Sequence, residues 1–459
     1  MLDTLIKNAT VIPMTEPGLV LYGASVGIKD GKLAFIGEGE EEAREVIDAA
    51  GRIVMPGLIN AHAHTAMCVM RGYADDYTLQ SWLFDKVFPV EARLDERAIV
   101  AGAVLGMAEM IASGTVSFSD MYFCQPAVAK AAERIGMKAN LCNAVIALGE
   151  GYDFDADRAV VETRKLLPEY GNSGRIRADV AIHAEYTSPP PIWQKVHEWA
   201  EKYGVITHIH LSETRTEHEE AKARHGMSAA AAFEKYGVMD TPVLFAHGVW
   251  LEEEDMRILS AHGASVAHCP VSNLKLGSGM ADVHAMKEAG INVCLGTDGA
   301  CSNNSLDLFE EIKLAALLAK GEALDPTALP AYEALKMATV NGAIAQGRGG
   351  QTGKLAPGYD ADLIMIDTSK PHLRPMYDPI GAVVYSARGS DVCLTMVEGR
   401  VLYRDGKWLT LDIEKALRGQ KGIVENLKTF KEDSGKDPTF ARFLKYYNLD
   451  PHSIYKTKC

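Results

Sequence analysis

The sequence has no long apolar run and no basic leader segment. None of its stretches approaches the roughly 18 consecutive apolar residues that a membrane-spanning helix needs. The first eight residues, Met1 to Asn8, lack the basic segment, apolar core and small-residue cleavage site of a secretory signal. We therefore predict a cytoplasmic protein without a membrane partner.

Cysteines are few and unpaired in the sequence. The chain has eight in 459 residues, and no two of them form a Cys-x-x-Cys motif. This spacing argues against both a disulfide framework and a thiolate zinc site. A metal bound to this chain has to be held by other ligands.

Basic residues are outnumbered by acidic ones. The chain has 47 Lys plus Arg and 61 Asp plus Glu, which gives a formal net charge of -14. A surface of this sign repels polyanions and argues against DNA or RNA as a partner. The 47% hydrophobic content excludes disorder. The length fits roughly two to four domains, or one large barrel with a smaller unit.

Short β-branched runs alternate with amphipathic segments through the middle of the chain. The strand candidates are residues 53–60, 115–119, 138–146, 176–182, 205–209, 243–246, 265–267 and 292–296. Helical periodicity covers 95–112, 192–203, 216–236, 252–261 and 306–319. Eight such strands predict an α/β fold, a (β/α)₈ TIM barrel with its active site at the carboxyl ends of the strands.

Strand patterns that are not followed by helices occur at both chain ends. Residues 5–12, 25–29 and 32–36 precede the barrel, and residues 362–367, 382–385, 392–397 and 400–403 follow it. We predict that 1–56 and 358–410 combine into one small β-sandwich, with the barrel over 57–357. Residues 411–459 contain Asp-Pro pairs at 437 and 450 and are predicted to form a C-terminal extension of two or three helices.

Titratable side chains follow seven of the eight strand candidates. They are His62 with His64, Asp120, His183, His210 with Glu213, His247, His268 and Asp298. Because His62 and His64 are two residues apart, both imidazoles of an extended segment point to one face and can chelate one ion. His210 and Asp298 complete a nitrogen and oxygen set suited to Zn²⁺ or Fe²⁺, with a position left for water.

A metal at this rim would make a hydrolytic nucleophile available. It lowers the pKa of bound water toward about 7, so the nucleophile exists at neutral pH. Glu213 lies three residues beyond His210. From the residues alone two interpretations of Glu213 stay open: a carboxylate that passes a proton to the substrate, or one that begins the next helix.

Five segments together resemble the amidohydrolase superfamily. They are Pro56-Gly-Leu-Ile-Asn-Ala-His62-Ala-His64, His208-Ile-His210-Leu-Ser-Glu213, Ala246-His247-Gly248, His268-Cys-Pro-Val-Ser-Asn273 and Gly296-Thr-Asp298-Gly299. More narrowly, they are similar to its 5-methylthioadenosine and S-adenosylhomocysteine deaminases. The resemblance extends from about residue 5 to about residue 410.

The resemblance implies a single divalent metal, Zn²⁺ with Fe²⁺ as the alternative. Its implied ligands are His62, His64, His210 and Asp298. Binuclear members carry a carboxylated lysine at the end of strand four, whereas residues 175–188 contain no lysine. The same resemblance gives Asp298 a catalytic role as well, since it would take the proton that water releases.

Further residues receive roles from the resemblance. Glu213 would shuttle a proton, and His247 would lie beside the attacking water. His183 would contact the substrate. In the segment that resembles the loop closing over the ligand, Trp82 would form an apolar wall and Glu91 would accept hydrogen bonds from ribose hydroxyls. A surface carboxylate is the alternative interpretation of Glu91.

The implied activity is hydrolytic deamination of an adenine nucleoside, which gives the inosine analogue and ammonia. The implied substrates are 5-methylthioadenosine, S-adenosylhomocysteine or a related 5′-substituted adenosine. Residues 149–157 supply acids where such deaminases are expected to have an arginine, so the accepted 5′ substituent stays open. The resemblance also implies a homo-oligomer.

Other functions fit the same scaffold. A guanine or pterin deaminase and a chloro-s-triazine hydrolase share the nucleophile and differ in the pocket. A non-catalytic scaffold protein is a more remote alternative, and the intact ligand set counts against it.

Overall fold

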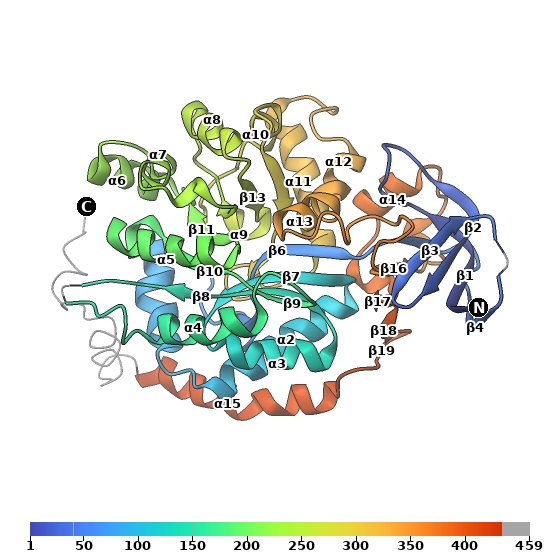
Figure 1. Cartoon of the computed structure of the whole chain (residues 1–459), viewed down its shortest axis with the longest axis horizontal. Helices are drawn as coiled ribbons and strands as arrows, with labels where there is room; N and C mark the ends of the chain where they lie inside the picture. The colour runs from blue at the N-terminus through green and yellow to red at the C-terminus, as the bar shows by residue number, and fades with distance from the viewer. Residues whose placement is uncertain (40, 150, 434–459) are drawn as a thin grey trace.

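The centre of the molecule is a parallel barrel. The computed structural model describes residues 1–39, 41–149 and 151–433 (Figure 1). The barrel strands are β6 (Leu58–His64), β7 (Thr115–Tyr122), β8 (Lys138–Val145), β10 (Val180–Ala184), β11 (Thr207–Leu211), β12 (Val243–His247), β13 (Ser265–His268) and β14 (Asn292–Leu295), with short β9 (Ile176–Ala178) beside β8. The chain continues from β14 into β15 (Asp298–Gly299), which pairs with β6 and closes the barrel. The predicted (β/α)₈ architecture is confirmed.

Helices and short turns cover the outside of the barrel. The longer ones are α2 (Glu96–Ala112), α3 (Gln125–Ile135), α4 (Arg158–Tyr170), α5 (Pro190–Tyr203), α6 (Arg215–His225), α7 (Ala229–Lys235), α8 (Glu253–Ala261) and α11 (Leu308–Ala323). Shorter ones are α9 (Pro270–Lys275), α10 (Val283–Glu288), α12 (Ala331–Met337) and α13 (Val340–Ala345). The single helix predicted over 216–236 is two helices, because Gly226 turns left-handed after α6 and Ser228 caps α7.

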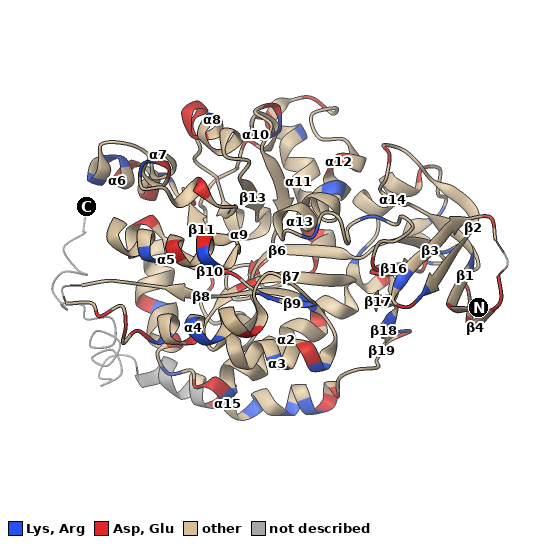
Figure 2. Cartoon of the chain, viewed as in Figure 1, with Lys and Arg blue, Asp and Glu red and all other residues tan. Residues whose placement is uncertain are grey.

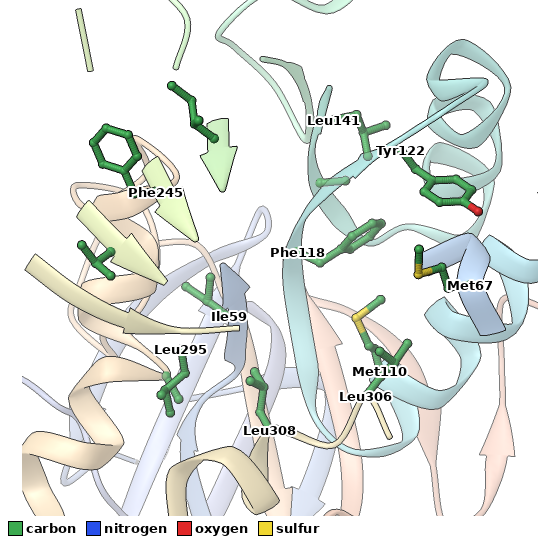
Figure 3. Close-up of a cluster of buried hydrophobic side chains, with 14 of the residues drawn as sticks. Ile59, Met67, Met110, Phe118, Tyr122, Leu141, Phe245, Leu295, Leu306 and Leu308 are labelled. Atoms are coloured by element: carbon green, nitrogen blue, oxygen red, sulfur yellow. The ribbon is translucent and has the colours of Figure 1, made fainter. Parts of the chain in front are cut away.

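Apolar side chains fill the space between the strands and the helices. Strands β7 and β8 are buried along their whole length, as expected for parallel strands that are covered on both faces. Figure 3 shows Ile59 of β6, Phe118 of β7 and Leu141 of β8 in one such cluster. The polar exceptions at the carboxyl ends of the strands form the site described below.

A second sheet combines strands from both chain ends. Its members are β1 (Leu2–Val11), β2 (Leu21–Lys29), β3 (Lys32–Gly37), β4 (Ala43–Asp48), β5 (Ile53–Pro56), β16 (Leu363–Ile366), β17 (Val392–Val397), β18 (Arg400–Arg404) and β19 (Lys407–Trp408). The two ends meet where β5 pairs antiparallel with β16. The predicted joining of both ends is confirmed, and the strands form one mixed sheet around a small apolar core of their own.

A buried ion cluster connects this sheet to the end of the barrel where the strands begin. Lys138 at the start of β8 is 1% exposed, and its ammonium lies 2.5 Å from both Asp360 and Asp362 and 3.6 Å from Glu398. Arg175 also pairs with Glu398, at 2.5 Å. The barrel and the second sheet are therefore joined by ion pairs, and those of Lys138 are buried.

One predicted strand is wrong. Residues 382–385 belong to α14 (Pro379–Tyr385), whose first turn is capped by the Asp378 side chain accepting a hydrogen bond from the Ile380 amide. The N-cap and the Pro at the helix start outweigh the β-branched run. In the C-terminal extension, α15 (Ile413–Asp433) packs against α2, and the predicted helix starts at 437 and 450 lie outside the described residues.

The outer surface mixes charges of both signs. Figure 2 shows acidic and basic positions interleaved along α5 and α15. Among the helices of the described ranges, none combines the length and the apolar character that a membrane crossing requires.

Candidate functional site

Four histidines and one aspartate converge at the carboxyl ends of the barrel strands. His62 and His64 end β6, His210 lies on β11, His247 ends β12 and Asp298 begins β15. Ala63, between the two β6 histidines, is the residue that pairs with Asp298 across the barrel closure. The pairing of β6 with β15 therefore places Asp298 beside the His-x-His pair.

The ligand-type atoms of this cluster lie close enough together to bind one metal ion. His62, His210, His247 and Asp298 each offer an atom, and these atoms all lie within 4.8 Å of one another. His64 adjoins the same group, with Nε2 3.1 Å from Asp298 Oδ1 and 3.3 Å from His210 Nε2. The structure thus adds His247 to the predicted set and keeps His64 in contact with it.

Each of the four histidines is anchored through Nδ1. His62 Nδ1 lies 2.9 Å from His208 Nε2, His210 Nδ1 lies 2.7 Å from the His183 carbonyl, His247 Nδ1 lies 2.8 Å from Asn273 Oδ1, and His64 Nδ1 contacts the Met121 carbonyl. Because carbonyl oxygens only accept, the Nδ1 atoms facing them carry the hydrogen. When the rings are neutral, their Nε2 lone pairs are therefore left to face the centre of the cluster, as in metal-binding histidines.

The donor set fits one zinc ion. Ligands at about 2.0–2.2 Å from a tetrahedral zinc lie roughly 3.3–3.6 Å apart. His62 Nε2 is 3.4 Å from Asp298 Oδ1 and, though buried, has no hydrogen-bond partner among the described residues. A buried, unpartnered acceptor beside a carboxylate is costly without a cation to bind it. The chain therefore holds one metal site, built from imidazole nitrogen and carboxylate oxygen.

Burial and mutual contact set the charge of these groups. Burial lowers the pKa of His62 to about 3. Burial also opposes the charged form of His64, yet its contact with Asp298 raises the pKa of His64 to about 9. Despite burial, the neighbouring His62 and His64 hold the pKa of Asp298 well below its usual value. Asp298 is thus ionised and His62 neutral, which are the forms that ligate a metal.

Three non-glycine residues at the site have a left-handed backbone. Their φ angles are 47° for Ser212, 74° for His247 and 60° for Asp298. Such conformations are unfavourable for residues with a Cβ and persist where the surrounding structure enforces them, often at functional sites. Here they turn the chain just past the ends of β11, β12 and β14.

A cavity of about 580 Å³, its open mouth included, lies over the cluster. Of the predicted site residues all but His62 line it, and His62 lies beneath. Glu213 is 6% exposed, with one carboxylate oxygen 3.8 Å from His247 Nε2 and the other 3.4 Å from Ser278 Oγ. Burial raises the pKa of Glu213, which favours the protonated form that a general acid needs.

The predicted substrate-contacting residues carry unpartnered polar atoms. Trp82 Nε1, Glu91 Oε1 and His183 Nδ1 are buried and have no hydrogen-bond partner among the described residues. Trp82 lies on η2 (Ser81–Val87) and Glu91 on the short α1 (Phe88–Glu91). Burial raises the pKa of Glu91 to about 7, although a hydrogen bond with Tyr122 acts in the opposite direction. Glu91 therefore lines the cavity and is not a surface carboxylate.

Several supporting residues were not predicted. Asn273 orients His247, while Ser272 and Ser302 donate to Asp298 Oδ2 at 2.6 and 2.7 Å. His208 also supports the site, since it contacts His62 directly. The signal for Asn273 and Ser272 was the His268-to-Asn273 segment itself, which places them one turn after the end of β13 (Ser265–His268).

His208 gives a testable prediction about metal binding. Burial and the adjacent His62 hold the pKa of His208 well below its usual value, so His208 is neutral and its Nε2 can accept from His62. We expect His208→Leu to weaken zinc affinity by about 10- to 100-fold, since outer partners of metal ligands have effects of this size. His208→Gln, which keeps an acceptor, serves as the matched control. Chelator competition measures both, and equal zinc affinity of the Leu variant and the unaltered protein would contradict the assignment.

The chain is similar to proteins of one family. The family model described as the amidohydrolase family matches residues 53–402. A 5-methylthioadenosine/S-adenosylhomocysteine deaminase of Acetivibrio thermocellus is 44% identical over 436 residues, covering 93% of this chain and 100% of that protein. A 5′-deoxyadenosine deaminase of Methanosarcina acetivorans is 44% identical over 430 residues, covering 93% and 99%. The crystal structure of an adenosine deaminase from Xanthomonas campestris with bound zinc has a TM-score of 0.89 at 29% identity, covering 93% and 99%.

Proposed function

The chain belongs to the amidohydrolase family, and from this membership we propose that it is a metal-dependent deaminase of 5′-substituted adenosines. One observation carries the proposal: four imidazole rings and the Asp298 carboxylate meet beside the buried carboxyl of Glu213, in one cavity. A nucleobase in this cavity would meet a cation site and a proton donor together. That combination suits hydrolysis of a ring C–N bond.

We infer that His62, His64, His210 and Asp298 hold the metal and that His247 lies beside the reacting water. In support, the Nε2 atom of His247 adjoins the cluster and is also 3.8 Å from Glu213. A zinc ion in this site supplies water activated for attack at neutral pH. Asn273 holds the His247 ring so that Nε2 remains an acceptor toward that water.

Asp298 and Glu213 divide the proton transfers. Ser272 and Ser302 donate hydrogen bonds to Asp298 Oδ2 and hold the carboxylate in place, and Asp298 takes the proton that water loses as it adds to C6 of the purine. The Glu213 carboxyl gives its proton to ring N1, so that negative charge does not accumulate on the ring. Asp298 then returns its proton to the amino group, which leaves as ammonia, and the C6 hydroxyl gives its proton to the Glu213 carboxylate, so that the inosine analogue remains.

The remaining predicted contacts suit the sugar and the base. Glu91 Oε1 is a free acceptor for a ribose hydroxyl, and Trp82 offers an apolar face. His183 Nδ1 is free for a polar atom of the substrate. That the chain forms a homo-oligomer stays a prediction from the family. Analytical sedimentation measures the oligomeric state.

Removal of the metal tests the proposed function. We expect zinc-loaded protein to release ammonia from 5-methylthioadenosine, 5′-deoxyadenosine or adenosine, and chelator-treated protein to lose this activity until zinc is restored. Guanine and a chloro-s-triazine serve as competing substrates. Ammonia from guanine alone, chloride from the triazine, or activity that survives metal removal would contradict the proposal.

A further inference from the structure

The cavity wall carries carboxyl groups and histidines, but no lysine or arginine among the described residues. Glu91, Glu213 and Asp298 line it, and no lysine or arginine does. Away from the metal site, an anionic group of a ligand inside this cavity would therefore lack a lysine or arginine to pair with. Burial of an unpaired charge is strongly unfavourable.

Two basic residues next to the wall are engaged elsewhere. Lys275, which precedes the lining residue Leu276, donates to Asp75 at 2.6 Å and to the Asn304 side chain. Arg71, just after the turn η1 (Thr65–Met70), pairs with Glu109 and donates to the Asn304 carbonyl. Neither cation is available to a ligand without losing these partners.

Much of the wall is apolar. Its apolar members are Met67, Leu79, Trp82, Leu83, Phe88, Met121, Phe123, Ile146 and Leu276. Figure 3 shows one part of it, with Met67 close to the ring of Tyr122. Since the polar cluster fixes the reacting carbon of the base and Glu91 suits the ribose, the apolar side chains that do not face the base remain for the 5′ group.

We infer that this site selects adenosines whose 5′ substituent is uncharged, hydrogen or an alkylthio group, over adenosines with a charged 5′ chain such as S-adenosylhomocysteine. The inference rests on the proposed function and narrows its substrate class. The homocysteine carboxylate would lie in a cavity that offers it no lysine or arginine and that already carries the Glu91 carboxyl, whereas a methylthio group contacts apolar carbon and sulfur. Loss of a partner for a buried charge predicts a kcat/KM about 10²-fold lower for S-adenosylhomocysteine than for 5-methylthioadenosine.

A substrate series on the zinc-loaded protein separates charge from size. 5′-Butylthio-5′-deoxyadenosine has the same chain length as S-adenosylhomocysteine and no charge. We expect 5-methylthioadenosine and the butylthio compound to be deaminated within about tenfold of each other, and S-adenosylhomocysteine to be about 10²-fold worse than both. Equal kcat/KM for all three overturns the inference, and so does a butylthio compound as poor as S-adenosylhomocysteine.

A variant with a new cation tests the same point in the opposite direction. Phe123 is half-buried and lines the cavity, so Phe123→Arg adds a positive charge there, and Phe123→Gln is its uncharged control. We expect the ratio of kcat/KM for S-adenosylhomocysteine to that for 5-methylthioadenosine to rise at least about tenfold in the Arg variant only. An unchanged ratio in both variants counts against selection by charge.

Failure of the proposed function gives a different result. If no adenosine is deaminated, the proposed function is wrong, and calorimetric binding of the same three compounds to the zinc-loaded protein still tests the inference. Tighter binding of both uncharged compounds supports selection by charge, and equal binding of the charged one contradicts it.

Discussion

Replacement of Glu213 by Gln is expected to lower kcat for adenosine deamination by about 10²- to 10⁴-fold, the range that a positioned proton donor contributes. The side chain is buried, 3.8 Å from His247 and 3.4 Å from Ser278. Glutamine keeps its size and a hydrogen-bonding oxygen but has no carboxyl proton for ring N1. The loss should therefore appear in kcat, while zinc content and melting temperature stay close to those of the unaltered protein.

The control for this substitution is Glu219→Gln. Glu219 is exposed on α6, the helix that follows Glu213, so the same chemical change there should leave kcat within about twofold, as surface substitutions usually do. A Glu213→Gln protein with full zinc content and more than about a tenth of the original kcat would show that Glu213 is not the proton donor.

Replacement of Lys138 by Met should cost about 3–5 kcal/mol of unfolding free energy, the range measured when one partner of a buried ion pair is removed. The ammonium group contacts Asp360 and Asp362 at 2.5 Å each, and the side chains of Lys138 and Asp362 are 1% and 0% exposed. Without the cation, the Asp362 carboxylate would be buried and uncompensated. Urea unfolding followed by tryptophan fluorescence measures the loss.

Lys32→Met provides the matched comparison. Lys32 also lies 2.5 Å from Asp360, but its side chain is 51% exposed, so its loss should cost no more than about 1 kcal/mol. If both variants lose the same free energy, burial is not what makes the Lys138 cluster important. A Lys138→Met protein as stable as the original would show that this cluster does not hold the barrel and the sheet together.

The barrel and its polar rim were predictable because their patterns are local. Fully buried parallel strands read as short apolar runs, and a His-x-His pair at the end of one run places both rings on one face. The order of the runs gave the topology, since eight strand–helix repeats close only in a limited number of ways. His62, His64, His210 and Asp298 could therefore be brought together before any coordinates were known.

Other features depend on contacts between distant residues, which a local pattern does not contain. The role of His208 follows from its 2.9 Å contact with His62, 146 positions away in the chain. The residues 382–385 have strand propensity but lie in a helix because Asp378 caps its start. The absence of lysine and arginine from the described part of the cavity wall likewise depends on where Lys275 and Arg71 find their partners.

The pairing of Asp298 with Ala63 closes the barrel between the two β6 histidines. The ligand set is therefore incomplete until the last strand has been made and has docked against the first, 235 residues later in the chain than Ala63. A partly synthesised chain that ends before Asp298 has histidines but no carboxylate to complete the site. The complete zinc site should thus form only when the barrel closes.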